Sequence, residues 1–201
     1  MIIIKNIVFD LGGVILKDKP NSVLEKLEID NNIYYELNRF FDNWEKLDLG
    51  EETLEEKFKQ CNFSKNIKDK YKDFLLNYYK YRDIDIRLID CINRLKSNGY
   101  NIYILSDNNK ECFEHYKNQS DFKNIDGWIL SCDYHTSKKD GKLFDILIDS
   151  FGLNPNECYY IDNNINNIEE ANKHGINGYL FNAKEDINKL YNDMRNNNIN
   201  I

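Results

Sequence analysis

The sequence predicts an α/β fold, with a doubly wound, Rossmann-like parallel sheet and a small α-helical cap inserted after the first strand. Two observations support this prediction. After Tyr81, short apolar segments alternate with amphipathic helical segments, which is the pattern of right-handed βαβ crossovers. Before that point and after the first strand, charged and aromatic residues recur at helical spacing, without a convincing strand. We therefore expect a core of residues 1–16 and 84–201 and a cap of residues 17–83.

The predicted strands are short and almost entirely apolar. Residues 2–9 are nearly continuous β-branched and apolar residues, as expected for a strand buried on both faces of a parallel sheet. Further strands are predicted at residues 101–105, 127–130, 158–161 and 178–181. The predicted core helices are residues 87–97, 142–151, 165–174 and 183–194. The asparagine-rich tail after the last helix is expected to fray.

The cap segment has two groups of apolar and aromatic residues at helical spacing. These are Trp44, Leu47, Leu54 and Phe58, and then Phe74, Leu75, Tyr78 and Tyr79. Gly50, followed by two glutamates and Thr53, predicts that one helix ends there and another begins.

The composition argues against several classes of function. The chain has 201 residues and a formal net charge of −7, so it lacks a basic stripe for nucleic-acid phosphates or an anionic membrane surface. Its 5 cysteines are scattered without a C-x-x-C pair, which favours reduced thiols over disulfides or a zinc site. The sequence shows neither a signal peptide nor a run of about 18 apolar residues. We therefore predict a cytoplasmic protein that binds neither nucleic acid nor membrane.

Polar residues follow four of the predicted strands, where each strand ends. They are Asp10, Gly12 and Gly13 after the first strand, Ser106 and Asp107 after the second, Lys138 after the third, and Asp162 and Asn163 after the fourth. In an open α/β sheet, ligands bind outside the carboxyl ends of the strands, near the point where the strand order reverses. The topology therefore predicts that carboxylates, a hydroxyl and a lysine meet at one edge of the sheet.

These groups suit nucleophilic attack on phosphorus. A carboxylate is ordinarily ionised at neutral pH, so we expect that Asp10 can form an acyl-phosphate without activation by a base. A hard cation held by Asp10 and Asp162 would neutralise the approach of carboxylate to phosphate. Ser106 and Lys138 would hold the phosphate oxygens, and the amides of the Gly12-Gly13 turn can face an anion.

Four sequence motifs resemble those of the haloacid dehalogenase-like (HAD-like) hydrolase superfamily, in the family's order. They are residues 8–14 (VFDLGGV), residues 104–107 (ILSD), residues 131–144 with Lys138 in the lysine position, and residues 160–164 (YIDNN) followed by Asn167, Ala171 and Gly175. The insertion point is that of the subclass with a helical cap. The Gly-Gly form of the first motif resembles a branch associated with sugar-phosphate phosphatases.

The resemblance implies a role for each of these residues. Asp10 is expected to be the nucleophile and, with Asp162 and the main-chain carbonyl of Gly12, a ligand of Mg²⁺. Ser106, Asp107, Lys138, Gly12 and Gly13 are expected to bind phosphate. Lys138 is favoured by register over Lys139 and Lys142. Asn163 and Asn167 are expected to support the site, and the partner is expected to be a small phosphorylated metabolite.

Two positions depart from the family's pattern. Phosphatases of the family usually carry a second aspartate two residues after the nucleophile, as the general acid, and here that position is Gly12. Because general acid catalysis contributes about a hundred- to ten-thousandfold, we expect a slow phosphatase or another proton donor, with Asp18 as a candidate. A sugar 1-phosphate would need less help from an acid. Asn163 replaces a frequent aspartate, which should weaken metal binding.

Two other functions remain open on the sequence. The first is hydrolytic dehalogenation of a 2-haloacid, because the family's dehalogenases also lack the second aspartate and release halide unprotonated. The second is a catalytically impaired member that binds phosphate without turnover. The sequence identifies neither the substrate nor the oligomeric state.

Overall fold

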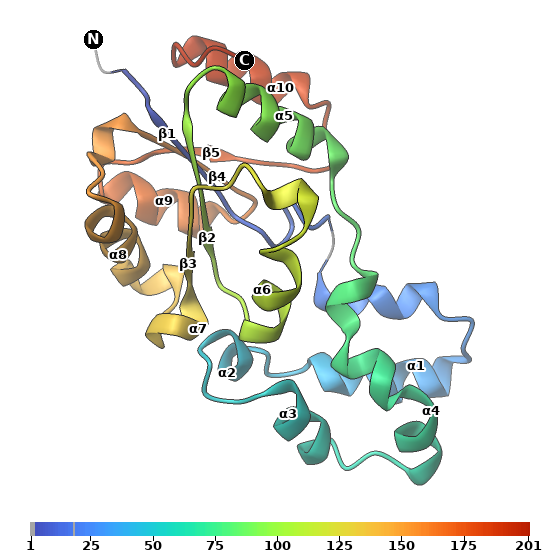
Figure 1. Ribbon diagram of the computed structural model, residues 1–201. Coiled ribbons are helices and arrows are strands. Elements are labelled where there is room, and N and C mark those ends of the chain that lie inside the picture. Colours follow the sequence, from blue (N-terminus) through green and yellow to red (C-terminus); the bar gives the residue numbers. More distant parts are fainter. Residues whose placement is uncertain (1–2, 18) are drawn as a thin grey trace.

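The computed structural model describes residues 3–17 and 19–201, and it contains one five-stranded parallel sheet (Figure 1). The strand order is β3-β2-β1-β4-β5. The strands are β1 (Asn6–Phe9), β2 (Asn101–Ser106), β3 (Gly127–Leu130), β4 (Cys158–Asp162) and β5 (Asn177–Leu180). Because β1 lies between β2 and β4, the strand order reverses at β1. The predicted doubly wound α/β fold is confirmed.

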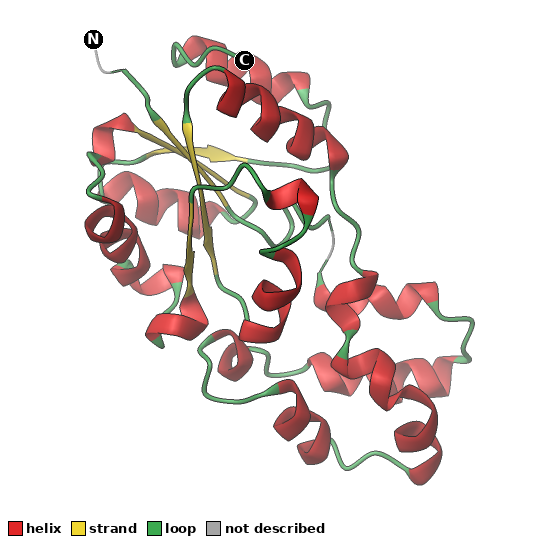
Figure 2. Cartoon of the chain, in the orientation of Figure 1, coloured by secondary structure: helices red, strands yellow, loops and turns green. Residues whose placement is uncertain are grey.

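Helices cover both faces of this sheet (Figures 1 and 2). The core helices are α5 (Ile86–Ser97), α6 (Lys110–Tyr116), α7 (Ser131–Tyr134), α8 (Lys142–Phe151), α9 (Ile165–Lys173) and α10 (Asn188–Asn196). One apolar cluster joins β1 to α5, α6 and α10, and a second joins Val8 to α8 and α9 on the opposite face. The alternation of side chains along β1 explains this, because Ile7 and Phe9 belong to the first cluster and Val8 to the second.

The segment between β1 and α5 is entirely helical apart from its loops (Figure 2). It contains α1 (Asn31–Asn38), α2 (Glu45–Asp48), α3 (Leu54–Gln60) and α4 (Lys65–Leu76), with 3₁₀ helices at Pro20–Lys26, Arg39–Phe41 and Tyr78–Tyr81. The predicted break at Gly50 is confirmed, and Thr53 begins α3 with a capping box to Glu56. This cap has its own apolar cluster, and Tyr79 packs against both that cluster and the core.

The carboxyl-terminal tail differs from the prediction that it frays. Ile199 is buried in the core cluster, and its amide donates to the Met194 carbonyl oxygen at 2.9 Å. The Asn200 amide donates to Tyr100 Oη at 2.8 Å, and the Asn98 side chain donates to the Asn200 carbonyl oxygen at 2.9 Å. A buried isoleucine and three hydrogen bonds therefore hold a segment whose composition alone indicated disorder.

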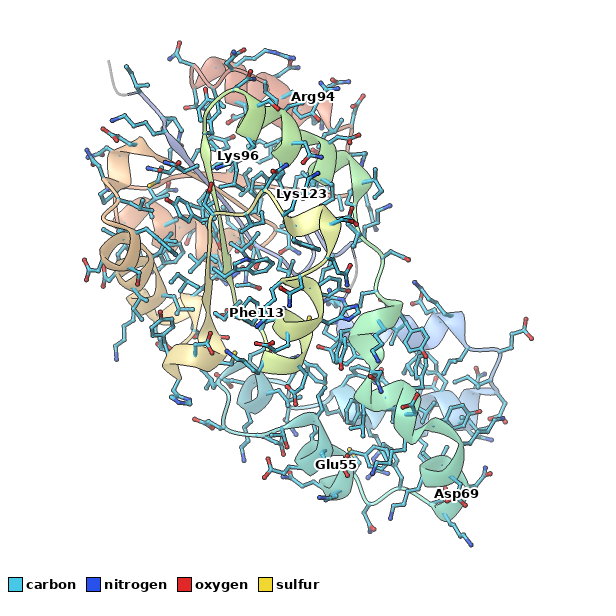
Figure 3. All side chains as sticks on the ribbon, viewed as in Figure 1. Glu55, Asp69, Arg94, Lys96, Phe113 and Lys123 are labelled. Atoms are coloured by element: carbon cyan, nitrogen blue, oxygen red, sulfur yellow. The ribbon has the colours of Figure 1, made fainter. Side chains whose placement is uncertain are left out.

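Charged side chains lie on the outside of both parts of the molecule (Figure 3). Asp69 on α4, Arg94 on α5 and Lys123 are exposed examples. Within the part of the chain that the structure describes, every helix is too short or too polar to span a bilayer.

Candidate active site at the carboxyl edge of the sheet

Asp10 lies directly after the central strand, where the strand order reverses. Its amide donates to the Ile161 carbonyl oxygen at 2.9 Å, which continues the pairing of β1 with β4 by one residue. The residue is 4% exposed. The side chain is therefore fixed at the carboxyl edge of the sheet, at the position where α/β folds bind their ligands.

The structure brings Asp10, Lys138 and Asp162 together. Lys138 Nζ donates to Asp10 Oδ1 and to Asp162 Oδ2, each at 2.8 Å. All three residues are buried, and Lys138 is 2% exposed. Two aspartates that are far apart in the sequence thus both pair with the ammonium group of Lys138.

A short 3₁₀ helix at Lys138–Asp140 positions the lysine. Ser137 and Asp140 form a reciprocal capping box around its first turn, and the Lys138 amide donates to Asp107 Oδ1 at 3.0 Å. Lys139 and Lys142 are exposed, and Lys139 pairs with Glu45 of the cap. Of the three lysines that compete for this role in the sequence, Lys138 is the one that reaches the two aspartates.

Asp162 accepts further hydrogen bonds besides the one from Lys138. Its Oδ1 accepts the Asn164 amide at 2.7 Å, and its Oδ2 accepts the Asn167 side chain at 2.9 Å. Tyr160, two residues earlier on β4, also donates its hydroxyl to Oδ2. Asn167, which the sequence predicts as a supporting residue, therefore contacts Asp162. Tyr160, which strand alternation places on the same face as Asp162, contacts it as well.

Ser106 and Asp107 end the neighbouring strand β2. Ser106 is 1% exposed, and its Oγ is buried without a hydrogen-bond partner among residues 3–17 and 19–201. Buried hydroxyl groups are normally paired, so the Ser106 hydroxyl has a hydrogen bond to give to a group beyond the described residues. Asp107 accepts the Lys138 amide and therefore joins the loop after β2 to the 3₁₀ helix.

The Gly12-Gly13 turn makes close contact with the loop after β4. Gly13 has a φ of +81°, and a Cβ there would lie 2.2 Å from Asn163 Nδ2, so the position requires glycine. The Gly13 amide donates to the Leu16 carbonyl oxygen at 2.7 Å. This bond uses the amide within the turn and disfavours the prediction that it faces phosphate.

Burial and charge set the ionisation of the three central groups. Burial raises the pKa of Asp10 to about 7, and Asp162 adds to this rise while Lys138 opposes it. Burial also raises the pKa of Asp162, but Lys138 and the hydrogen bonds from Tyr160 and Asn167 hold it below its usual value. Burial lowers the pKa of Lys138, and Asp10, Tyr160 and Asp162 raise it well above its usual value. The site therefore keeps a lysine cation beside one firmly ionised carboxylate.

A cavity of about 200 Å³ opens between the core and the cap at this edge. Its lining residues are Gly12, Gly13, Asp107, Asn108 and Asn163 from the core, Arg82 from the junction, and Lys19, Pro20, Trp44 and Asp48 from the cap. Sequence reasoning missed Asp48 and Arg82 as site residues. Arg82 is buried and Asp48 is half-buried. The only local feature of the sequence that could have indicated Asp48 as a site residue is its position two residues before the predicted helix break at Gly50.

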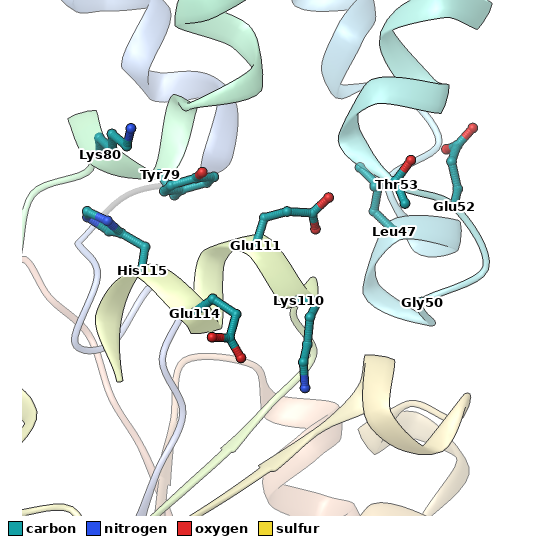
Figure 4. A pocket seen from close by; sticks show the side chains of 10 residues that line it. All are labelled: Leu47, Gly50, Glu52, Thr53, Tyr79, Lys80, Lys110, Glu111, Glu114 and His115. Carbon is teal, nitrogen blue, oxygen red and sulfur yellow. The ribbon is translucent and has the colours of Figure 1, made fainter. Parts of the chain in front are cut away.

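A larger cavity, about 550 Å³, lies between the cap and α6 (Figure 4). Figure 4 shows Glu111, Glu114 and His115 of α6 on one wall and Leu47 and Thr53 of the cap on another. None of the site residues predicted from the sequence lines it. Of the predicted site residues, Gly12, Gly13, Asp107 and Asn163 line the smaller cavity, which is therefore the candidate site.

The donor set fits a divalent cation of the magnesium type. Mg²⁺ is usually bound by one or two carboxylates together with water and substrate phosphate oxygens. Asp10 and Asp162 provide two carboxylates that already face one positive group. Among the described residues, no three or more of His, Cys, Asp and Glu form a metal cluster, so further ligands would come from the main chain, as predicted for Gly12, and from the substrate.

One further candidate of the sequence cannot be placed, and one histidine contacts the cap. Asp18, a candidate replacement acid, lies outside the described residues. His135, which ends α7, has a left-handed backbone with a φ of 53°, and its Nδ1 lies 2.7 Å from the Leu49 carbonyl oxygen of the cap.

Comparisons with known proteins agree with this geometry. A family model for haloacid dehalogenase-like hydrolases matches residues 4–175. A D-ribitol-5-phosphate phosphatase of Bacteroides thetaiotaomicron is 26% identical over 192 residues, which are 86% of this chain and 89% of that enzyme. An (S)-2-haloacid dehalogenase of Burkholderia cepacia is 28% identical over 114 residues, or 56% of this chain, and the match spans about half (49%) of that enzyme.

The fold has close counterparts among solved structures. A haloacid dehalogenase family enzyme of Bacteroides thetaiotaomicron, in complex with magnesium and inorganic phosphate, superposes with a TM-score of 0.67 at 21% identity. The superposition covers 94% of this chain and 99% of that one, so cap and core are both included.

Proposed function

Because the chain belongs to the haloacid dehalogenase-like hydrolase family, we propose that it is a Mg²⁺-dependent phosphatase that hydrolyses a small phosphomonoester through a phosphorylated Asp10. The observation that carries this proposal is the convergence of Asp10 and Asp162 on Lys138 beside the unpaired hydroxyl of Ser106. Paired carboxylates with a cation and a free hydroxyl donor suit a phosphoryl group, which needs charge neutralisation more than proton transfer.

Each residue of the site would have a separate role in the reaction. A carboxylate oxygen of Asp10 attacks phosphorus and forms the P–O bond of an acyl-phosphate, while the bond to the leaving oxygen breaks. Lys138 and Ser106 hold the non-bridging oxygens, and Asn167 and Tyr160 keep Asp162 in position. Mg²⁺, held by Asp10, Asp162 and the Gly12 carbonyl, would neutralise the negative charge of the phosphate.

The relatives and the cavity favour a sugar phosphate as substrate. One curated relative acts on ribitol 5-phosphate, and one structural relative was solved with magnesium and inorganic phosphate. A cavity of about 200 Å³ suits a small metabolite rather than a macromolecule. Since Gly12 provides no general acid, turnover of unactivated esters is slow unless another residue donates the proton.

Two alternatives have specific support. The dehalogenase relative and the missing acid favour attack of Asp10 on the carbon of a 2-haloacid, which would not depend on a metal. The missing acid also favours a protein that binds phosphate without turnover. Both alternatives use the same pocket, so activity measurements must separate them.

The test is a screen of sugar phosphates, an aryl phosphate and 2-chloropropionate, with Mg²⁺ or with a chelator. We expect phosphate release that requires Mg²⁺, and Asp10→Asn should reduce it at least about a thousandfold. Asp69→Asn, on the exposed face of α4, is the matched control and should retain full activity. Halide release that persists with the chelator would replace the proposal by a dehalogenase, and wild-type protein that binds phosphate but releases none would replace it by a binding protein.

A further inference from the structure

We propose that Asp48 of the cap is the proton donor to the leaving-group oxygen, in place of the side chain that Gly12 lacks. This inference rests on the proposed phosphatase function. It names a catalytic residue that lies 38 positions downstream of the nucleophile, in a different part of the fold from the usual acid.

Several contacts hold α2 against the core at the site. Ser131 donates its hydroxyl to the Asp48 carbonyl oxygen, and the same hydroxyl accepts the Asn108 amide at 2.9 Å. His135 Nδ1 lies 2.7 Å from the next carbonyl oxygen, that of Leu49. A Cβ at Gly50 would lie 2.5 Å from the Cys132 carbonyl oxygen, so only glycine permits this approach. These contacts between α2 and the core therefore fix the position of Asp48 beside the site.

Asp48 shares the site cavity with the position of the missing acid. Gly12 and Asp48 both line the cavity of about 200 Å³. A Cβ added at Gly12 would have Arg82 Nη2 as its nearest neighbour, at 4.0 Å, so the turn leaves open space on that side. With phosphate at the strand ends, the organic part of the substrate extends toward the cap. A carboxylic acid on the cap wall is placed to meet the ester oxygen.

The other carboxylates of the site have different partners. Asp48 and Asp107 are the carboxylates among the described residues that line this cavity. Asp107 accepts the Lys138 amide, while Asp10 and Asp162 are paired with the Lys138 ammonium. Among the described residues that line the cavity, Asp48 is therefore the carboxylic acid that makes no bond to the Lys138 segment and faces the position of a ligand.

The surroundings of Asp48 favour its neutral form. Burial raises its pKa to about 7, with further rises from Asp107 and Asp10, while Lys138 and Arg82 oppose them. The half-buried side chain thus combines access to the cavity with a pKa near neutrality, where an acid can both give and recover a proton.

The proton balance closes over the two steps. As Asp10 attacks phosphorus, the bond from phosphorus to the ester oxygen breaks, and that oxygen takes its proton from Asp48 and leaves as the alcohol. The Asp48 carboxylate then accepts a proton from the water that attacks the aspartyl-phosphate. Inorganic phosphate leaves, Asp10 returns as a carboxylate, and Asp48 returns as the acid.

The decisive experiment compares two esters in wild type and Asp48→Asn, with Mg²⁺. Ribitol 5-phosphate has an alkoxide leaving group that needs a proton, whereas 4-nitrophenyl phosphate releases nitrophenolate without one. We expect Asp48→Asn to reduce turnover of the alkyl ester about a hundred- to ten-thousandfold. With the aryl ester, the first burst of nitrophenolate should persist and phosphorylated Asp10 should accumulate, because its hydrolysis lacks a base.

Controls separate this role from a structural one. Glu45→Gln changes an exposed residue of the same short helix and should behave as wild type. Asp48→Glu keeps the acid and should exceed Asp48→Asn on the alkyl ester at least about tenfold. Equal losses of burst and turnover on both esters, or no loss at all, would overturn the role of Asp48 and leave the phosphatase intact. Wild type that turns over neither ester would instead overturn the proposed function.

Discussion

At the scale of single residues, the site depends on the ammonium group of Lys138, which is shared by the buried carboxylates of Asp10 and Asp162. The strand-end rule predicted that Asp10, Lys138 and Asp162 would meet, because each follows a strand of the same parallel sheet. The same rule could not predict that Asp48 lies at the site, because Asp48 does not follow a strand. Its position depends on how the cap docks against α7, and local periodicity carries no information about that contact.

Removing the Lys138 ammonium group gives a prediction on the stability of the protein. Lys138→Met leaves two carboxylates buried without a positive partner, so the free energy of unfolding should fall by about 3–5 kcal/mol. Added Mg²⁺ should raise the Tm of this variant more than that of the wild type, because the metal would neutralise the same pair. Lys139→Met, at an exposed pair, should cost at most about 1 kcal/mol. Equal Mg²⁺ shifts in variant and wild type would contradict a metal site between the two aspartates.

At the scale of elements, all five strands were predicted, but β1 begins only at Asn6, later than the predicted strand of residues 2–9, and the short helices were not predicted. Uninterrupted apolar residues mark strands buried on both faces, and Gly127–Leu130 matches its prediction residue for residue. The prediction missed α6, because in a helix of 7 residues only one pair of buried residues, Cys112 and Tyr116, shows the helical spacing. The last helix starts at Asn188 rather than residue 183, because the chain first crosses from β5 to the edge of α5, where Arg87 bonds the Ala183 carbonyl oxygen.

The start of α5 gives a prediction on pH dependence. Asp85 caps this helix and pairs with Arg87, with Nε at 2.9 Å from Oδ1. Burial raises the pKa of Asp85, but its hydrogen bonds with Arg87 hold it below the ordinary value of 3.8. A lowered folded pKa stabilises the protein above the unfolded pKa, and this contribution is lost as the pH falls through the folded value.

Asp85→Asn keeps a cap residue but removes the charge. We expect a loss of about 1–3 kcal/mol in the free energy of unfolding at pH 7. The difference from wild type should remain constant down to about pH 5 and shrink below about pH 4. Urea unfolding at several pH values measures it, with Asp149→Asn on the exposed face of α8 as the control. A difference that persists at pH 3 would show that the charge of Asp85 is not its source.

At the scale of the whole molecule, cap and core have separate apolar clusters. The sequence predicted this division from a change in periodicity, and the structure shows one cluster within the cap and two on the faces of the sheet. Tyr79 packs against the cap cluster and one core cluster, and Ser131 and His135 of the core contact main-chain carbonyl oxygens of the cap. The two parts should therefore differ in local stability.

Leu37→Ala tests this division. Leu37 is fully buried in the cap cluster, so the substitution should destabilise the cap by about 2–5 kcal/mol. In amide hydrogen exchange, we expect cap amides to lose protection while those of β1, β2 and β4 keep it. Leu105→Ala, in the core, should lower protection in the sheet. Equal loss in cap and sheet for Leu37→Ala would show that the molecule unfolds as one unit.

The hydroxyl of Ser131 joins two parts that come from opposite sides of the cavity. It accepts from the loop after β2 and donates to the last residue of α2. Ser131 therefore links the core loop to the cap directly, beside the contacts of His135 with Leu49 and of Gly50 with Cys132. Ser131→Ala would remove both bonds at once and should weaken the docking of the cap on the core.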